Sequence, residues 1–285
     1  MRISNISPLR YPGGKAKLTK FIADVITFNK LEGCTYVEIF AGGAGAALAL
    51  LFNKIVDKIV INDYDTGIYA IWYSILNNTE DFCERISNTP VSIDEWHRQK
   101  AIHGTADNLL DLGFSTFFLN RTNRSGIIKG GVIGGLEQNG KYKIDCRFSK
   151  DELIKRIRMI ASFRDRISLS CLDAGEFIRT KLIEIPDKSL IYFDPPYFKQ
   201  GPELYTNFYN DNDHKVLSNL IKENVTQPWI ITYDNCDEIS SLYDNFLQEK
   251  YSLNYSVNNK YKGKEIIIYS NDLTPCNSKN INYCV

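Results

Sequence analysis

The stretch Ser189-Leu-Ile-Tyr-Phe-Asp194-Pro195-Pro196-Tyr197 decides how the rest of the chain is interpreted. Its first five residues form a short apolar run, which predicts a buried strand of a parallel sheet. Two consecutive prolines cannot continue a strand, because neither has an N–H group to donate. The pattern therefore predicts an acidic residue fixed at the carboxyl end of a strand, with an aromatic ring just beyond it. Open α/β sheets bind their ligands at that end.

A glycine turn earlier in the chain predicts a nucleoside-type cofactor. Residues 35–40 form a predicted strand, and the turn Ala41-Gly-Gly-Ala-Gly45 leads from it into a helix that ends near Asn53. A second predicted strand, 58–62, is followed by Asp63-Tyr-Asp65. An acid about 20 residues past the turn can accept both hydroxyls of an adenosine ribose. The glycine spacing differs from the GxGxxG pattern, so a nicotinamide dehydrogenase is the least favoured alternative.

The remaining pattern predicts further elements of an α/β fold. The turn Pro8-Leu-Arg-Tyr-Pro-Gly-Gly-Lys15 precedes a predicted helix that reaches Leu31, and Lys15 near its start can reach an anion. Helices are predicted within 66–122 and at 150–161 and 213–223, and strands at 166–171 and 228–233. Residues 250–257 and 265–269 are predicted to form a hairpin with its turn at 258–263, and the polar tail from 271 is predicted to be frayed.

Charge is spread unevenly along a chain whose formal net charge is zero. Residues 114–170 hold twelve Lys and Arg against five Asp and Glu, so this segment carries +7 and the remainder −7. Paired glycines within it predict a mobile hairpin or loop. A local basic face can bind phosphate while the whole protein stays neutral, although a solvated helix surface gives the same pattern.

Composition narrows the class of protein. The 285 residues are 44% hydrophobic and 24% charged, as in soluble globular proteins. No apolar run reaches the length of a membrane span, and the N-terminus lacks the apolar core of a signal peptide. Seven cysteines without CxxC spacing and only three histidines disfavour a zinc site. Free thiols in a reducing cytoplasm are the favoured interpretation.

These motifs together resemble the Dam-type DNA adenine methylase family, which depends on S-adenosylmethionine. The matching stretches are PLRYPGGK (8–15), VEIFAGGAG (37–45), INDYD (61–65), FFLNRTNRSGI (117–127) and YFDPPY (192–197). The resemblance implies a Rossmann-like class I methyltransferase sheet with an inserted helical and β-hairpin DNA-recognition subdomain. The implied limits are 1–75 and 160–275 for the catalytic domain, 76–159 for target recognition and 276–285 for a polar tail.

The resemblance also implies residue roles. The residues implied to bind the cofactor are Tyr11, Lys15, Glu38, Phe40, Gly42, Gly45, Asp63 and Asp173. The residues implied to hold the flipped base are Asp194, Pro195, Pro196 and Tyr197. Predicted DNA contacts are Asn120, Arg121, Arg124, Lys129, Lys141 and Lys143, with the three lysines assigned to phosphates and Arg124 to a guanine edge. Thr122 and Arg124 replace aromatic residues of the GATC-reading prototypes, so the target sequence cannot be borrowed.

The chemistry follows from the residue types. The amino nitrogen of adenine is a poor nucleophile, and the Asp194 carboxylate and Pro195 carbonyl can both accept its hydrogens while Tyr197 stacks on the ring. The base must leave the duplex to reach them, and no metal is needed. The alternative substrates are cytosine in DNA, methylated at N4, adenine in RNA and a protein glutamine amide. A further alternative is a DNA-binding module without catalytic activity. We expect a cytoplasmic monomer of bacterial or phage origin, acting on double-stranded DNA with or without a cognate restriction endonuclease.

Overall fold

The computed structural model describes residues 6–10, 18–199, 209–257 and 259–283, with backbone only for 253–264. The chain divides into two compact units. Unit 1 comprises residues 1–14 and 63–171, and unit 2 comprises residues 15–62 and 172–285.

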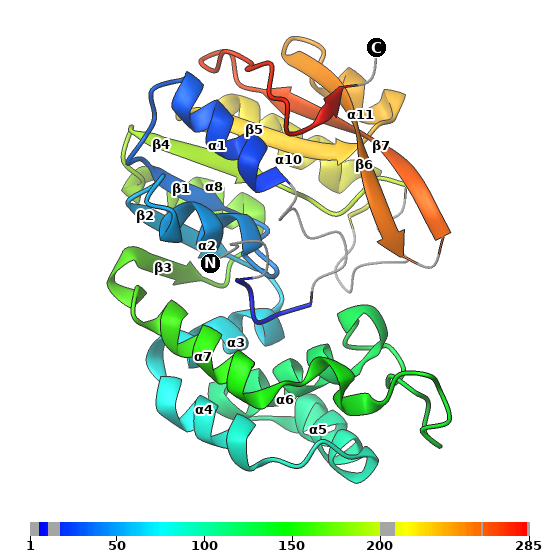
Figure 1. The fold of residues 1–285 in the computed structure, drawn as a ribbon. Coiled ribbons are helices and arrows are strands. Elements are labelled where there is room, and N and C mark those ends of the chain that lie inside the picture. The colour runs from blue at the N-terminus through cyan, green and yellow to red at the C-terminus, as the bar shows by residue number, and fades with distance from the viewer. Residues whose placement is uncertain (1–5, 11–17, 200–208, 258, 284–285) are drawn as a thin grey trace. The chain divides into compact units, whose positions relative to one another are not determined.

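Unit 2 is built on a sheet with the strand order β2-β1-β4-β5-β7-β6-β8 (Figure 1). The parallel strands are β1 (Thr35–Glu38), β2 (Lys58–Asn62), β4 (Ser189–Phe193) and β5 (Trp229–Asp234). The antiparallel strands are β6 (Leu247–Val257), β7 (Asn259–Tyr269) and β8 (Asn282–Tyr283). The predicted α/β fold with a mainly parallel sheet is confirmed. The predicted turn at 258–263 is wrong, because β6 and β7 stay paired as far as Val257 and Asn259.

Alternation along the strands gives the two faces of this sheet different characters. One face is apolar and packs against α8 (Ala174–Thr180), α10 (Asp211–Asn224) and α11 (Asp237–Leu242); its strand residues include Val37, Ile191, Phe193, Ile231, Tyr233, Ile266 and Ile268. The other face carries buried polar side chains, namely Tyr36, Glu38, Tyr192, Thr232 and Glu265. The helix α2 (Gly45–Phe52) lies on that polar face, since the Ala47 N–H donates to Glu38.

The C-terminal stretch differs from the predicted frayed tail. Asn29, after α1 (Thr19–Phe28), exchanges two hydrogen bonds with the backbone of Thr274. Asp24 accepts from the side chains of Ser278 and Asn280, and β8 pairs with β6. These polar residues find partners inside unit 2, which composition alone does not reveal.

Unit 1 is mainly helical. Its helices are α3 (Thr66–Asn77), α4 (Thr79–Asn88), α5 (Ile93–Thr105), α6 (Leu109–Thr122) and α7 (Lys150–Ala161), followed by the short strand β3 (Ile167–Ser170). Helices α3 and α6 pack closely at Gly113, where a Cβ atom would lie 2.5 Å from the Ala70 carbonyl oxygen. The predicted helices within 66–122 and at 150–161 are confirmed.

The glycine-rich stretch of unit 1 forms a loop and not a β-hairpin. Within it lie the 3-10 turns η2 (Arg124–Gly126) and η3 (Ile144–Arg147), and a single isolated bridge joins Asn123 to Val132. Gly134 and Gly135 have positive φ, which interrupts an extended strand. Lys141 accordingly lies in a bend and Lys143 in the irregular stretch directly before η3.

Within the described residues no helix is long and apolar enough to cross a membrane. In the same part of the chain no group of three or more His, Cys, Asp or Glu side chains is arranged to hold a metal ion.

Candidate active site

The turn after β1 brings a buried carboxyl group to the start of a helix. Glu38, the last residue of β1, is 5% exposed. Its Oε1 accepts from the Tyr36 hydroxyl at 3.2 Å and from the Ala47 N–H in α2 at 3.1 Å. Gly42 and Ala44 both have positive φ, so the chain reverses tightly between strand and helix.

Burial governs the electrostatics of this carboxyl group. Loss of water contact, with a smaller effect of the nearby Asp194 charge, raises the pKa of Glu38 to about 8, although the hydrogen bonds from Tyr36 and Ala47 act to lower it. An ionised carboxyl group that is buried without a partner is unfavourable, so this group favours a bound proton or a cation beside it. The site therefore suits a ligand that carries positive charge.

Asp194 is oriented by a chain of hydroxyl groups that sequence reasoning missed. The Thr232 hydroxyl donates to Asp194 Oδ1 at 3.0 Å, and Tyr192 lies 2.8 Å from the same hydroxyl. Since Thr232 has one hydrogen to donate, Tyr192 donates to Thr232 in turn. Tyr192 also stacks on Tyr36, with ring centroids 6.3 Å apart. The chain fixes one oxygen of Asp194 at the carboxyl end of β4.

Tyr197 is held through its hydroxyl group as well as through its ring. The hydroxyl donates to Glu265 Oε1 at 2.8 Å, and Tyr251 donates to Oε2 of the same carboxyl group. Tyr197 and Glu265 are 6% and 1% exposed. Each oxygen of the Glu265 carboxyl group thus accepts a hydrogen bond from a tyrosine. Glu265 follows the mainly polar residues 259–264 of β7 and comes directly before the apolar run Ile266-Ile267-Ile268, so the sequence contains no signal that it is buried.

The segment after Tyr197 is anchored by the acid at the end of β5. Asp234 accepts the backbone N–H of Phe198 at 2.8 Å and that of Lys199 at 2.9 Å. Asp234, like Asp194, is an acid at the carboxyl end of an apolar strand, where open α/β sheets bind their ligands, so the sequence pattern that indicated Asp194 indicates Asp234 as well.

An aromatic cluster connects the glycine turn to this segment. The Phe40 ring meets Tyr209 edge-on at 6.0 Å, Tyr209 contacts the ring of His214, and His214 contacts Phe198 at 5.2 Å. His214 is buried, and burial lowers its pKa. The predicted cofactor residue Phe40 thus shares one cluster with the neighbour of Tyr197.

Two other predicted cofactor acids take part in local turns. In unit 1, Asp63 is 9% exposed and its Oδ1 accepts from the Asp65 N–H at 2.9 Å, while Asp65 caps α3. In unit 2, Asp173 is exposed and caps α8 by accepting from the Gly175 N–H at 2.9 Å. Gly45 is the first residue of α2. Tyr11 and Lys15 lie outside the described residues.

Asn120 is buried among backbone groups of unit 1. Its side-chain oxygen accepts from the Arg10 N–H at 2.8 Å, and its amino group donates to the carbonyls of Arg10 at 2.7 Å and Gly126 at 3.0 Å. With an exposed fraction of 1%, Asn120 holds these backbone groups together, and its predicted DNA contact stays a prediction.

The other predicted DNA residues differ in how far they are engaged. Arg121 is half-buried and donates to the carbonyls of Arg147 and Pro8. Lys143 donates to the Gln138 carbonyl, and Lys141 lies over the Tyr142 ring. Arg124 and Lys129 are exposed, and neither side chain has a partner among the described residues.

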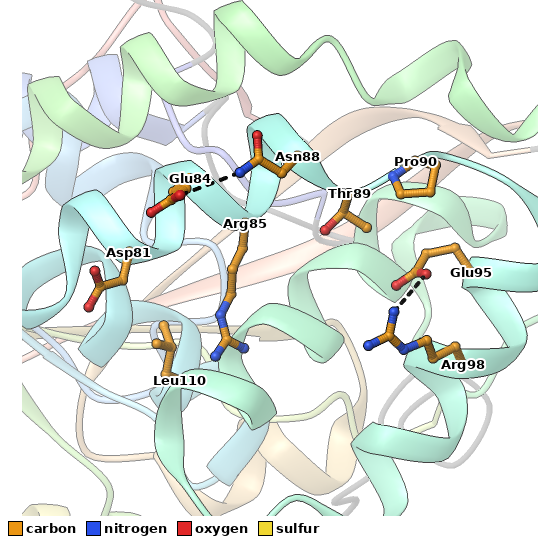
Figure 2. Close-up of a pocket in the computed structure, with 9 residues that line it drawn as sticks. All are labelled: Asp81, Glu84, Arg85, Asn88, Thr89, Pro90, Glu95, Arg98 and Leu110. Atoms are coloured by element: carbon orange, nitrogen blue, oxygen red, sulfur yellow. Dashed lines mark hydrogen bonds and ion pairs between the residues drawn. The ribbon is translucent and has the colours of Figure 1, made fainter.

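A cavity in unit 1 contains none of the predicted site residues (Figure 2). It has a volume of about 570 Å³ and lies among α4, α5 and the start of α6. Its two arginines already have partners: Arg98 pairs with Glu95 at 3.5 Å (Figure 2), and Arg85 pairs with Asp111. The positive charges of the cavity are therefore neutralised within the protein.

Comparison with protein families gives a match over most of the chain. The model of the D12 class N6 adenine-specific DNA methyltransferases matches residues 11–257. This description favours adenine in DNA over the cytosine, RNA and protein alternatives. Comparison with curated protein sequences gave no match.

Several solved methyltransferase structures are similar in backbone. An S-adenosylmethionine-dependent methyltransferase from Agrobacterium tumefaciens is 9% identical with a TM-score of 0.42; the match covers 90% of this chain and 62% of that protein's length. TrmK from M. capricolum, in complex with S-adenosylhomocysteine, is 10% identical with a TM-score of 0.37, covering 87% and 68%. The rRNA methyltransferase aviRa from Streptomyces viridochromogenes is 9% identical with a TM-score of 0.39, covering 95% and 92%.

Proposed function

Because the chain belongs to the D12 class N6 adenine-specific DNA methyltransferases, we propose that it methylates adenine in double-stranded DNA with Asp194, Pro195 and Tyr197 at the base. The observation that carries this assignment is the fixed carboxylate of Asp194, held by Thr232 beside two prolines at the carboxyl end of β4. The donor is S-adenosylmethionine and the product is S-adenosylhomocysteine.

The residues at the base act on the amino group of adenine. Its lone pair is delocalised into the ring, so the nitrogen must become more pyramidal before it can attack. Hydrogen bonds from this amino group to the Asp194 carboxylate and the Pro195 carbonyl favour the pyramidal form, mainly in the transition state. Pro196 stiffens the turn, and Tyr197 supplies a ring on which the flipped base can stack.

The residues around the glycine turn fit the cofactor. Bound S-adenosylmethionine supplies an electrophilic methyl group on a positively charged sulfur. Glu38 is a buried carboxyl group that favours a cation, and the amino group of the methionine moiety provides one. Phe40, Gly42 and Gly45 border the same turn. Asp63 and Asp173 are assigned to the ribose and the adenine of the cofactor, and Tyr11 and Lys15 complete the predicted set.

Residues 76–159 are assigned to target recognition, and 1–75 with 160–275 to catalysis. Exposed Arg124 is assigned to a base edge, because its planar fork suits guanine. Lys129, Lys141 and Lys143 are assigned to phosphates. The enzyme is further proposed to act as a monomer in the cytoplasm of a bacterium or a phage host, with any cognate restriction endonuclease acting independently.

The test is expression in cells that lack DNA methylation, followed by single-molecule sequencing of the genome. We expect N6-methyladenine at one sequence motif. Asp194→Ala should lower the single-turnover methylation rate at least about 10²-fold while cofactor affinity changes little. Modified cytosine in place of adenine, or a rate within a few-fold of wild type for Asp194→Ala, would contradict the assignment.

A further inference from the structure

Four arginines of unit 1 come from four chain segments and lie close enough to one another for their charges to interact. Arg10 belongs to the N-terminal segment, Arg121 to the end of α6, Arg147 to the turn η3 and Arg156 to α7. The Arg121 guanidinium donates to the Arg147 carbonyl at 2.7 Å and to the Pro8 carbonyl at 3.3 Å. Arg10 Nη1 donates to the Asn123 carbonyl at 2.8 Å. These four residues are called the arginine cluster below.

The positive charges of the arginine cluster act on one another. Burial, followed by the charges of Arg10, Arg156 and Arg147, lowers the pKa of Arg121 to about 10. Burial and the charge of Arg147 also lower the pKa of Arg10. Among the residues that the structure describes, the acidic group that opposes these effects is the thiol of Cys146 and not a carboxylate. Four guanidinium groups are therefore held together at an electrostatic cost.

The cluster differs from other arginines of the same unit. Arg158 pairs with Glu80 at 2.6 Å, and Arg85 pairs with Asp111. Among the described residues, no carboxylate forms an ion pair with any member of the cluster, and the recorded acceptors of Arg10 and Arg121 are backbone carbonyls. Arg147 is exposed and the other three are half-buried, so an anion from outside the protein can reach the site.

We propose that the arginine cluster is a binding site for a phosphodiester group of the DNA backbone. The inference rests on the proposed function and adds Arg10, Arg147 and Arg156 to its DNA contacts. A phosphate offers oxygens that match the planar fork of arginine, and it supplies the negative charge that the cluster lacks. A contact of this kind positions the protein on DNA but reads no sequence.

The local backbone links this site to the assigned base reader. Asn120 joins the Arg10 backbone to the Gly126 carbonyl, and a Cβ at Gly126 would lie 2.3 Å from the Arg10 carbonyl oxygen. Gly126 ends the turn η2, which begins at Arg124. A phosphate held by the cluster would thus lie near the turn that carries Arg124, while Arg124 itself would read the base.

The experiment compares two members of the cluster with a matched control on the same helix. Arg147→Gln removes an exposed charge of η3, and Arg156→Gln removes a half-buried charge of α7. The control, Arg158→Gln, removes an arginine of α7 that pairs with Glu80. Binding to a short mixed-sequence duplex is measured by fluorescence anisotropy from about 50 to about 200 mM salt. Thermal melting confirms that each variant is folded.

Each cluster variant should weaken binding by roughly tenfold at moderate salt. Each should also reduce the slope of log affinity against log salt by about one. Arg158→Gln should leave the slope unchanged, and Arg156→Lys should restore most of it because a point charge still attracts phosphate. None of these variants should alter the methylated sequence motif.

The proposal is overturned if Arg158→Gln changes the slope as much as the cluster variants, since the effect would then be general surface charge. Unchanged slopes for both cluster variants overturn it as well. If DNA is methylated and the slopes do not change, the arginine cluster fails while the proposed function stands. If the slopes change and no methyl transfer to DNA is found, the phosphate site stands and the proposed function fails.

Discussion

Replacing Tyr197 by Phe removes one oxygen atom, and the structure predicts that both stability and methyl transfer suffer. A ring that only stacks on a base would tolerate this change. The Tyr197 hydroxyl, however, donates to Glu265 at 2.8 Å in a buried place, and Glu265 receives a second hydrogen bond from Tyr251. The ring position therefore depends on a carboxylate 68 residues away in the chain.

The size of the effect follows from this contact. Leaving a buried acceptor without its hydrogen-bond donor costs about 1–3 kcal/mol, so Tyr197→Phe should lower the free energy of unfolding by that amount. A ring that lacks its anchor stacks less well on the base, and we expect the single-turnover methylation rate to fall by roughly tenfold, or about 1.4 kcal/mol in the barrier. Urea denaturation and rapid-quench assays measure the two quantities. Cofactor affinity should stay unchanged.

Tyr251→Phe is the matched control, because it removes the other hydrogen bond to the same carboxylate and leaves the Tyr197 anchor in place. It should destabilise the fold comparably while its methylation rate stays near wild type. The reasoning is refuted if Tyr197→Phe matches wild type in stability and rate. It is also refuted if Tyr251→Phe slows methylation as strongly as Tyr197→Phe does.

Three further predictions concern other parts of the molecule. The buried Glu38 has a pKa of about 8 against an ordinary value of 4.5, so the cofactor-free protein should lose up to about 5 kcal/mol of unfolding free energy as the pH rises from about 4.5 to about 8. Denaturation of the Glu38→Gln variant over the same pH range should not show this loss. Thr232→Val should slow methylation by roughly tenfold in rapid-quench assays with cofactor affinity intact, because Asp194 loses its orienting donor. Gly113→Ala should lower the melting temperature and destabilise unit 1 by about 1–3 kcal/mol, because the new Cβ would lie 2.5 Å from the Ala70 carbonyl oxygen.

The strands and their carboxyl ends could be predicted from the sequence because local patterns determine them. The run 189–193 is apolar and ends at two prolines, and β4 ends at Phe193 as expected. The parallel strands β1, β2, β4 and β5 all fall within or close to their predicted limits. The glycine-rich loop was harder to predict, since paired glycines permit both a hairpin and a loop. The isolated bridge at Asn123 shows that the loop prevails.

Exposure could not be predicted in the same way. Asn120 and Arg124 lie in one motif and both have polar side chains, yet one is buried against the Arg10 backbone and the other is exposed. The difference arises because Arg10, 110 residues earlier in the chain, folds onto the end of α6. No local pattern contains that contact.

The partners of the catalytic motif were hidden for a related reason. A parallel strand is buried on both faces, so its sequence looks continuously apolar and does not reveal which alternate residues share a face. Register pairs Tyr192 of β4 with Ile230 of β5, so Tyr192, Thr232 and Asp194 share one face and their side chains meet across the two strands. Hydroxyl groups at such positions must find partners once water is excluded. The network around Asp194 and Tyr197 is thus a consequence of strand register, and it can be tested at positions that the DPPY motif does not contain.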